Sequence, residues 1–177
     1  YPVALKISSA RIMHKTEAGG IALNVKTDAQ ARAAFKKIIA NAKKYMPHAD
    51  IQGVLVQEML QGGLEAIVGT IDDPVFGPCV MFGLGGVFVE ALKDVSFRVA
   101  PLSRADAEEM VKEIKGYSVL RGLRGRPPVD MEALIDVILK VSCLASDYKD
   151  TIKELDINPL ILSEKGAKVA DALIIRK

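Results

Sequence analysis

The sequence predicts an α+β fold of about two layers, in which short antiparallel strands pack against a few amphipathic helices. One observation is a series of short β-type runs between residues 54 and 102, separated by Gly, Pro and polar turns. Parallel neighbours need a crossover of a dozen or more residues, so this close spacing favours hairpins. The other observation is a set of helical apolar stripes, each preceded by a capping residue at Thr27, Ser103 or Asp130.

The predicted elements run from an N-terminal hairpin to a C-terminal hairpin. The helix opened by Thr27 stops before Pro47, the helix opened by Ser103 ends at Gly116, and a third helix follows Asp130. The predicted strands are residues 3–8, 21–25, 54–60, 65–71, 79–83, 87–92, 97–102, 154–162 and 168–175.

The composition excludes some classes of function. Of 177 residues, 50% are hydrophobic and 26% charged, and the formal net charge is +2, so no basic field indicates nucleic acid or an anionic membrane. No apolar run approaches the roughly 18–20 residues of a membrane span. Cys79 and Cys143 lie in apolar surroundings, which is typical of buried thiols in a cytoplasmic protein. Because the chain opens at Tyr1 directly in a strand, we expect it to be part of a longer protein.

One of only two histidines, His14, follows the first strand and precedes Gly19 and Gly20. A neutral imidazole is a nucleophile near physiological pH and can form covalent intermediates. Glycine lets backbone amides approach an anionic group closely. The pattern indicates phosphoryl transfer, although an ordinary surface loop explains the same residues.

Two strands carry polar residues with open roles. Lys6 lies mid-strand, either on the solvent face of an edge strand or with its ammonium aimed into a cleft to hold a phosphate. Glu58 ends an apolar strand before the turn at residues 61–63, where backbone groups could meet a purine edge; a polar strand terminus is the alternative. Across that turn, Glu65 is expected close to Glu58.

The C-terminal hairpin holds the most specific polar pattern. Alternation places Asp156 and Asn158 on the same face of one strand, and Pro159 predicts an edge strand or a strand end. Asp171 is a single acid in the partner strand and can lie across from Asn158. Mg²⁺ prefers one or two carboxylates together with water and substrate phosphates, so Asn158 and Asp171 predict a magnesium site. Asp156 alone is equally explained as a solvent-facing residue.

Two further sets of charged residues have less specific predicted roles. Asp94 and Arg98 are expected to form a structural ion pair. The loop with Arg121, Arg124 and Arg126 is either an anion- or partner-binding loop or a solvated one.

Four segments in this order resemble the ATP-grasp domain of ADP-forming acyl-CoA synthetases (acetate–CoA ligase), which are related to the β subunit of succinyl-CoA synthetase. They are Tyr-Pro-Val-Ala-Leu-Lys at residues 1–6, His-Lys-Thr-Glu-Ala-Gly-Gly at 14–20, the block at 82–90 with 93–98, and Glu-Leu-Asp-Ile-Asn-Pro-Leu at 154–160. The resemblance covers essentially the whole chain. It implies an ATP-grasp fold whose two α/β lobes, with largely antiparallel sheets, clasp Mg-ATP or Mg-ADP.

The resemblance also implies a lobe boundary and residue roles. Residues 1–53 would be part of the first lobe, whose N-terminal portion is missing, and residues 54–177 the second lobe. His14 would relay phosphate between the nucleotide and an acyl-CoA site. The implied nucleotide contacts are Lys6, Gly19, Gly20, Gln57, Glu58, Met59, Leu60 and Glu65, and the implied Mg²⁺ residues are Asn158 and Asp171, supported by Asp156.

The implied enzyme is an acid–thiol ligase that works with a partner. CoA and the carboxylic acid would bind a CoA-binding α subunit or a fused domain, in a hetero-oligomer or a multidomain chain in the cytoplasm. The alternative is a regulatory ATP-grasp-like domain of a protein lysine acetyltransferase, in which the His14 block can persist.

Overall fold

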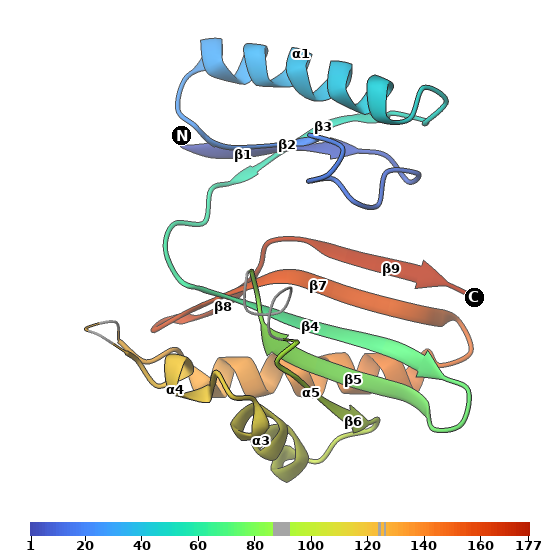
Figure 1. The fold of residues 1–177 in the computed structure, drawn as a ribbon, viewed down its shortest axis with the longest axis vertical. Coiled ribbons are helices and arrows are strands. Elements are labelled where there is room, and N and C mark those ends of the chain that lie inside the picture. The colour runs from blue at the N-terminus through green and yellow to red at the C-terminus, as the bar shows by residue number, and fades with distance from the viewer. Residues whose placement is uncertain (87–92, 124, 126) are drawn as a thin grey trace. The chain divides into compact units, whose positions relative to one another are not determined.

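The structure is a computed structural model of the 177-residue chain, and it describes residues 1–86, 93–123, 125 and 127–177. The chain divides into two compact units, Tyr1–Gln61 and Gly62–Lys177 (Figure 1). The predicted boundary after residue 53 is therefore too early. Strand β3 (Gly53–Glu58) pairs with β1 (Val3–Ser8), so residues 54–61 belong to the first unit.

The first unit is a three-stranded antiparallel sheet covered on one face by a helix (Figure 1). Its strand order is β2-β1-β3, with β2 at Ile21–Val25, and the helix is α1 at Asp28–Tyr45. The Thr27 side chain accepts from Gln30 N, which begins the helix as predicted. Alternate residues of β1 are buried with residues of α1 in one apolar cluster, comprising Leu5, Ile7, Ile12, Ala18, Val25, Ile38 and Ala42.

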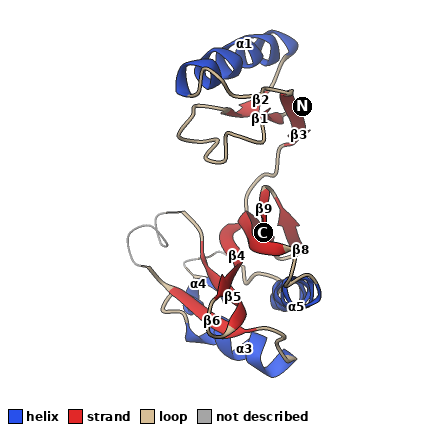
Figure 2. Ribbon diagram, turned by 90° about the vertical axis from the view of Figure 1, so that its right-hand side faces the viewer, coloured by secondary structure: helices blue, strands red, loops and turns tan. Residues whose placement is uncertain are grey.

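The second unit is a six-stranded antiparallel sheet with helices packed against it (Figure 2). The strands follow the order β6-β5-β4-β7-β8, and β9 also pairs with β7. The strand bounds are β4 Leu64–Asp73, β5 Gly77–Leu84, β6 Val95–Val99, β7 Ile152–Ser163, β8 Gly166–Val169 and β9 Ala172–Arg176. The helices are α3 Arg104–Glu113, α4 Tyr117–Leu120 and α5 Met131–Asp147.

Local signals in the second unit are largely confirmed. Ser103 forms a capping box with Asp106, and the Asp130 side chain accepts from Ala133 N. The last predicted strand, residues 168–175, is divided into β8 and β9 by Ala170 and Asp171. The predicted strand at 87–92 and the arginines at 124 and 126 lie outside the described residues.

Two expectations about single side chains are wrong. Asp94 and Arg98 do not pair with each other in the structure: Arg98 Nη1 lies 2.8 Å from Glu113 Oε2, and the Asp94 carboxylate accepts from Lys115 N and Gly116 N at 2.8 and 2.7 Å. Cys79 is buried as expected, whereas Cys143 is exposed on α5. Across the described residues, none of the helices is long and apolar enough to cross a membrane.

Replacing Asp94 with alanine is expected to lower the free energy of unfolding by about 2 to 4 kcal/mol. The reason is that two backbone N–H groups just after the C-terminus of α3, those of Lys115 and Gly116, lose their charged acceptor. Asp94 is only 6% exposed, so water cannot readily replace it. Urea denaturation measures the loss. Asp136→Ala is the matched control: its exposed ion pair with Lys140 is expected to contribute at most about 1 kcal/mol. Equal losses in the two variants would contradict the assignment.

Candidate active site

His14 lies on the segment between β1 and β2, and its side chain is exposed. Buried residues lie on either side of it, Ile12 at 1% and Ala18 at 4% exposure. Between them the backbone folds back on itself: Ala18 N donates to His14 O at 3.2 Å, and Gly20 N donates to Lys15 O at 2.8 Å. The segment therefore holds an exposed imidazole on a turn whose two limbs are packed into the core of the first unit.

Both glycines of this segment lie where a side chain would crowd its neighbours. Gly19 has φ +59°, and a Cβ there would lie 2.7 Å from Asn41 Nδ2. A Cβ on Gly20 would lie 2.6 Å from Ile7 Cγ2. In this conformation Gly19 N donates to Thr16 O and Gly20 N to Lys15 O. The predicted phosphate contact would need these hydrogen bonds to open.

Lys6 lies in the central strand of its sheet, paired to Ile21 on one side and Leu55 on the other, and it is 7% exposed. The solvent-facing, edge-strand interpretation is therefore wrong. Leu5 and Ile7 pack in the cluster under α1. Since side chains alternate along a strand, Lys6 lies on the opposite face of the sheet.

The residues predicted to border a purine divide between the two units. Gln57 pairs with Ala4 and so shares the face of Lys6, while Glu58 pairs with Val3. Met59 and Leu60 follow the strand and are half-buried. Glu65 belongs to β4, which pairs with β5 and β7.

Strand β3 pairs with β1, whereas β4 pairs with β5 and β7, so the hairpin expected between the strands of Glu58 and Glu65 does not form. The backbone of Glu65 is hydrogen-bonded to the glycine-rich turn after β5: Gly85 N donates to Glu65 O at 2.7 Å. A Cβ on Gly85 would lie 2.8 Å from Glu65 Cβ. This close approach explains the need for glycine at that position.

The second unit brings Asp156, Asn158 and Asp171 together. Leu155 and Ile157 are buried in the core, so Asp156 and Asn158 lie on the opposite face of β7, as predicted. Asn158 N donates to Asp171 O at 3.1 Å, which places Asp171 beside Asn158 in the break between β8 and β9.

A β-bulge positions this group. Ala66 pairs with Leu160 but Val68 pairs with Ile157, so Asn158 and Pro159 together oppose a single residue of β4. The prediction that Pro159 lies at a sheet edge or strand end is wrong, because β7 is an interior strand. A bulge also tolerates a residue without an N–H.

The electrostatics of this group fit a divalent cation. Burial raises the pKa of the Asp156 carboxyl, a hydrogen bond with the Asn158 side chain lowers it, and the charge of Asp171 raises it. Two neighbouring carboxylates and an amide oxygen form a donor set of the kind that Mg²⁺ completes with water and phosphate oxygens. Among the residues with described positions, no three His, Cys, Asp or Glu side chains gather as a denser metal cluster.

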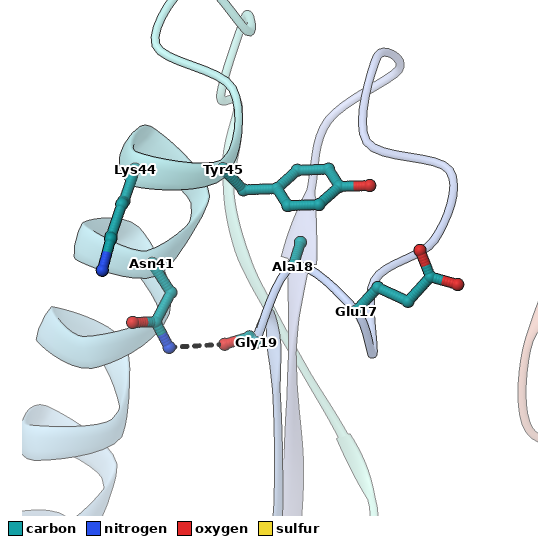
Figure 3. A pocket seen from close by; sticks show the side chains of 6 residues that line it. All are labelled: Glu17, Ala18, Gly19, Asn41, Lys44 and Tyr45. Carbon is teal, nitrogen blue, oxygen red and sulfur yellow. Dashed lines mark hydrogen bonds between the residues drawn. The ribbon is translucent and has the colours of Figure 1, made fainter.

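One feature was not predicted from the sequence. An open depression of about 560 Å³ lies beside the His14 segment, lined by Glu17, Ala18, Gly19, Asn41, Lys44 and Tyr45 (Figure 3). Asn41 Nδ2 donates to Gly19 O at 2.9 Å across it. The available signal was an asparagine in the interior of a helix, where its propensity is poor.

Comparison with known proteins places these features in a family. The model of the ATP-grasp domain matches residues 1–175. The β subunit of acetate–CoA ligase [ADP-forming] I from Pyrococcus furiosus is 55% identical over 99% of this chain and 75% of its own length. Acetate–CoA ligase [ADP-forming] I from Archaeoglobus fulgidus is 50% identical over 97% of this chain, which corresponds to 25% of its own length.

Solved structures agree with this relationship. The dinucleotide-forming acetyl-coenzyme A synthetase 1 of Ca. Korarchaeum cryptofilum, in complex with coenzyme A and Ca-AMPCP, has a TM-score of 0.96 and 49% identity over 100% of this chain and 77% of that chain. A second structure of that protein, with Mg-AMPPCP and its phosphohistidine segment pointing towards the nucleotide-binding site, has a TM-score of 0.84 and 46% identity over the same shares.

The relatives named above are CoA ligases or synthetases, and nothing in the comparisons supports the acetyltransferase alternative. The chain belongs to the ATP-grasp domain family, in the branch formed by the β subunits and domains of ADP-forming acetate–CoA ligases.

Proposed function

We propose that this chain transfers phosphate between Mg-ATP or Mg-ADP and His14, as the nucleotide-binding part of an ADP-forming acyl-CoA synthetase. The observation that supports this proposal most directly is the exposure of the His14 imidazole, a nucleophile, between two buried residues of the same segment, Ile12 and Ala18. The structure of the relative from Ca. Korarchaeum cryptofilum with bound Mg-AMPPCP, whose phosphohistidine segment points towards the nucleotide-binding site, supports this assignment.

The proposed transfer exchanges one bond to phosphorus for another. In the direction of ATP use, a neutral imidazole nitrogen of His14 attacks the γ-phosphorus; a P–N bond forms and the P–O bond to the departing ADP breaks. In the opposite direction ADP accepts the phosphoryl group from His14. Such transfer depends mainly on positioning and on neutralising phosphate charge.

The remaining predicted site residues have roles in this transfer. Lys6 would contact nucleotide phosphates as a point charge, and the glycine amides at Gly19 and Gly20 would assist when the turn opens. Asn158 and Asp171, supported by Asp156, would hold Mg²⁺, which supplies charge neutralisation when bound. The residues proposed to border the adenine are Gln57, Glu58, Met59 and Leu60, with Glu65 nearby.

We further propose a partner for the second half of the reaction. One relative is called subunit β, and this chain spans 25% of another, so a CoA-binding subunit or fused domain would hold CoA and the carboxylic acid. The assembly would be a hetero-oligomer or a multidomain chain in the cytoplasm.

The direct test incubates the full-length protein with Mg-ATP labelled at the γ-phosphate. A phosphoramidate on histidine is expected, recognised as protein-bound label that acid removes and base does not. Protein that binds Mg-ATP but acquires no label would overturn the proposed transfer.

A further inference from the structure

We infer that Asn41 is a positioning residue that latches the His14 segment onto α1. This inference rests on the proposed function, in which His14 must meet a nucleotide and then a second acceptor. The segment must therefore be held in a defined conformation and also be able to leave it.

The C-terminal part of α1 and the turn after it hold both limbs of the segment. On the N-terminal limb, Arg11 Nη1 donates to His48 O at 3.1 Å. On the C-terminal limb, Asn41 Nδ2 donates to Gly19 O at 2.9 Å, and Figure 3 shows the amide directed at that carbonyl. Ile12 and Ala18 pack in the same cluster as Ile38 and Ala42 of α1.

Asn41 and Gly19 are matched in shape as well as in hydrogen bonding. A Cβ at residue 19 would lie 2.7 Å from Asn41 Nδ2 and 3.3 Å from its Cγ, so the amide fills the place of a side chain there. Gly19 also has φ +59°, which most residues adopt only with strain. The contact therefore lies at a glycine, where a change of backbone conformation meets little steric resistance.

The helix itself gains nothing from asparagine at this position. Asn has a lower helix propensity than Ala in a helix interior, and residue 41 lies well inside α1. Apolar packing of Ile12 and Ala18 is not directional, whereas the Asn41 hydrogen bond forms only when Gly19 has this orientation. The hydrogen bond thus selects one conformation of the carrier without preventing its release.

The test compares Asn41→Ala with Lys44→Ala, which changes another side chain lining the same depression. In Asn41→Ala, hydrogen exchange at the amides of residues 18–20 is expected to rise about fivefold, as the loss of one hydrogen bond predicts. The kcat of the proposed phosphate transfer is expected to fall by a similar factor, while KM for Mg-nucleotide stays within about twofold of the wild-type value. Lys44→Ala is expected to change none of these quantities.

Each result decides the inference. Exchange at residues 18–20 that stays unchanged in Asn41→Ala would show that the amide holds nothing, and an unchanged kcat would show that the latch has no part in transfer. A rise in exchange throughout the first unit, with a higher KM, would indicate a purely structural role. If wild type acquires no label, the proposed function fails, while the exchange measurement still reports on the latch.

Discussion

Replacing His14 with alanine is expected to lower the amount of phosphate label that Mg-ATP places on the protein by at least about 100-fold. The reason is that alanine offers no nitrogen nucleophile in place of the exposed imidazole. Quantified acid-labile label per chain measures the effect. Because the proposed function makes His14 the phosphate acceptor and not a nucleotide anchor, KM for Mg-nucleotide is expected to change less than threefold.

His48→Ala is the matched control within this chain, which contains two histidines. His48 is exposed in the turn after α1, and Arg11 contacts its backbone carbonyl, which alanine retains. The His48 variant is therefore expected to keep the full label. Label that survived in His14→Ala and vanished in His48→Ala would transfer the carrier role to the other histidine.

Much of the fold was predictable because its signals are local. Thr27, Ser103 and Asp130 each accept a backbone N–H at the start of a helix, as short spacings in the sequence indicate. The strand pairs are antiparallel, as predicted. Strands β4 and β5 form a hairpin of the kind that close spacing indicates.

The hairpin expected between residues 54–60 and 65–71 shows where local spacing misleads. Gly62 and Gly63, with φ +69° and +91°, resemble a hairpin turn between the strands on either side. A Cβ on Gly63, however, would lie 2.6 Å from Ile161 Cγ2 and 2.8 Å from Leu162 O. Glycine is required there by close approach to β7, a strand about a hundred residues away in sequence, and local spacing does not encode that contact.

The candidate site shows the same contrast between local signals and long-range contacts. Alternation along β7 correctly placed Asp156 and Asn158 on one face, because period-two geometry needs no tertiary information. The bulge at Asn158 and Pro159 depends on pairing with β4, and it was missed. Asn41 was missed for the same reason, since its partner Gly19 becomes a neighbour only when the segment packs on α1.

The largest expected effect in the second unit is on Mg²⁺ dependence. Asp171→Asn is expected to raise the Mg²⁺ concentration for half-maximal activity at least about 100-fold, because it removes the charge of a proposed ligand. Asp156→Asn removes a carboxylate proposed to support the ligands and is expected to raise this Mg²⁺ concentration about 10- to 100-fold. Mg²⁺ titration of labelled phosphate transfer measures both. Asp136→Asn, an exposed acid on α5, is the control and is expected to leave the Mg²⁺ dependence unchanged.

Asp156→Asn is also expected to stabilise the Mg²⁺-free protein at neutral pH, by a few tenths of a kcal/mol because the carboxylate is half-exposed and solvent screens it. Burial, followed by the charge of Asp171, raises the pKa of Asp156 above 3.8, so the native state holds this proton more firmly than the unfolded chain. Wild type therefore loses stability as the pH rises through the folded-state pKa, and asparagine avoids that loss. The advantage should disappear near pH 3, where both states of the wild-type residue are protonated. A carboxylate with a purely structural role would not combine greater stability without Mg²⁺ with a higher Mg²⁺ requirement. Urea denaturation across this pH range, together with the Mg²⁺ titration, therefore separates a metal-supporting role from a structural one. An Asp156→Asn protein that is less stable at pH 7 and keeps its Mg²⁺ dependence would contradict the metal assignment.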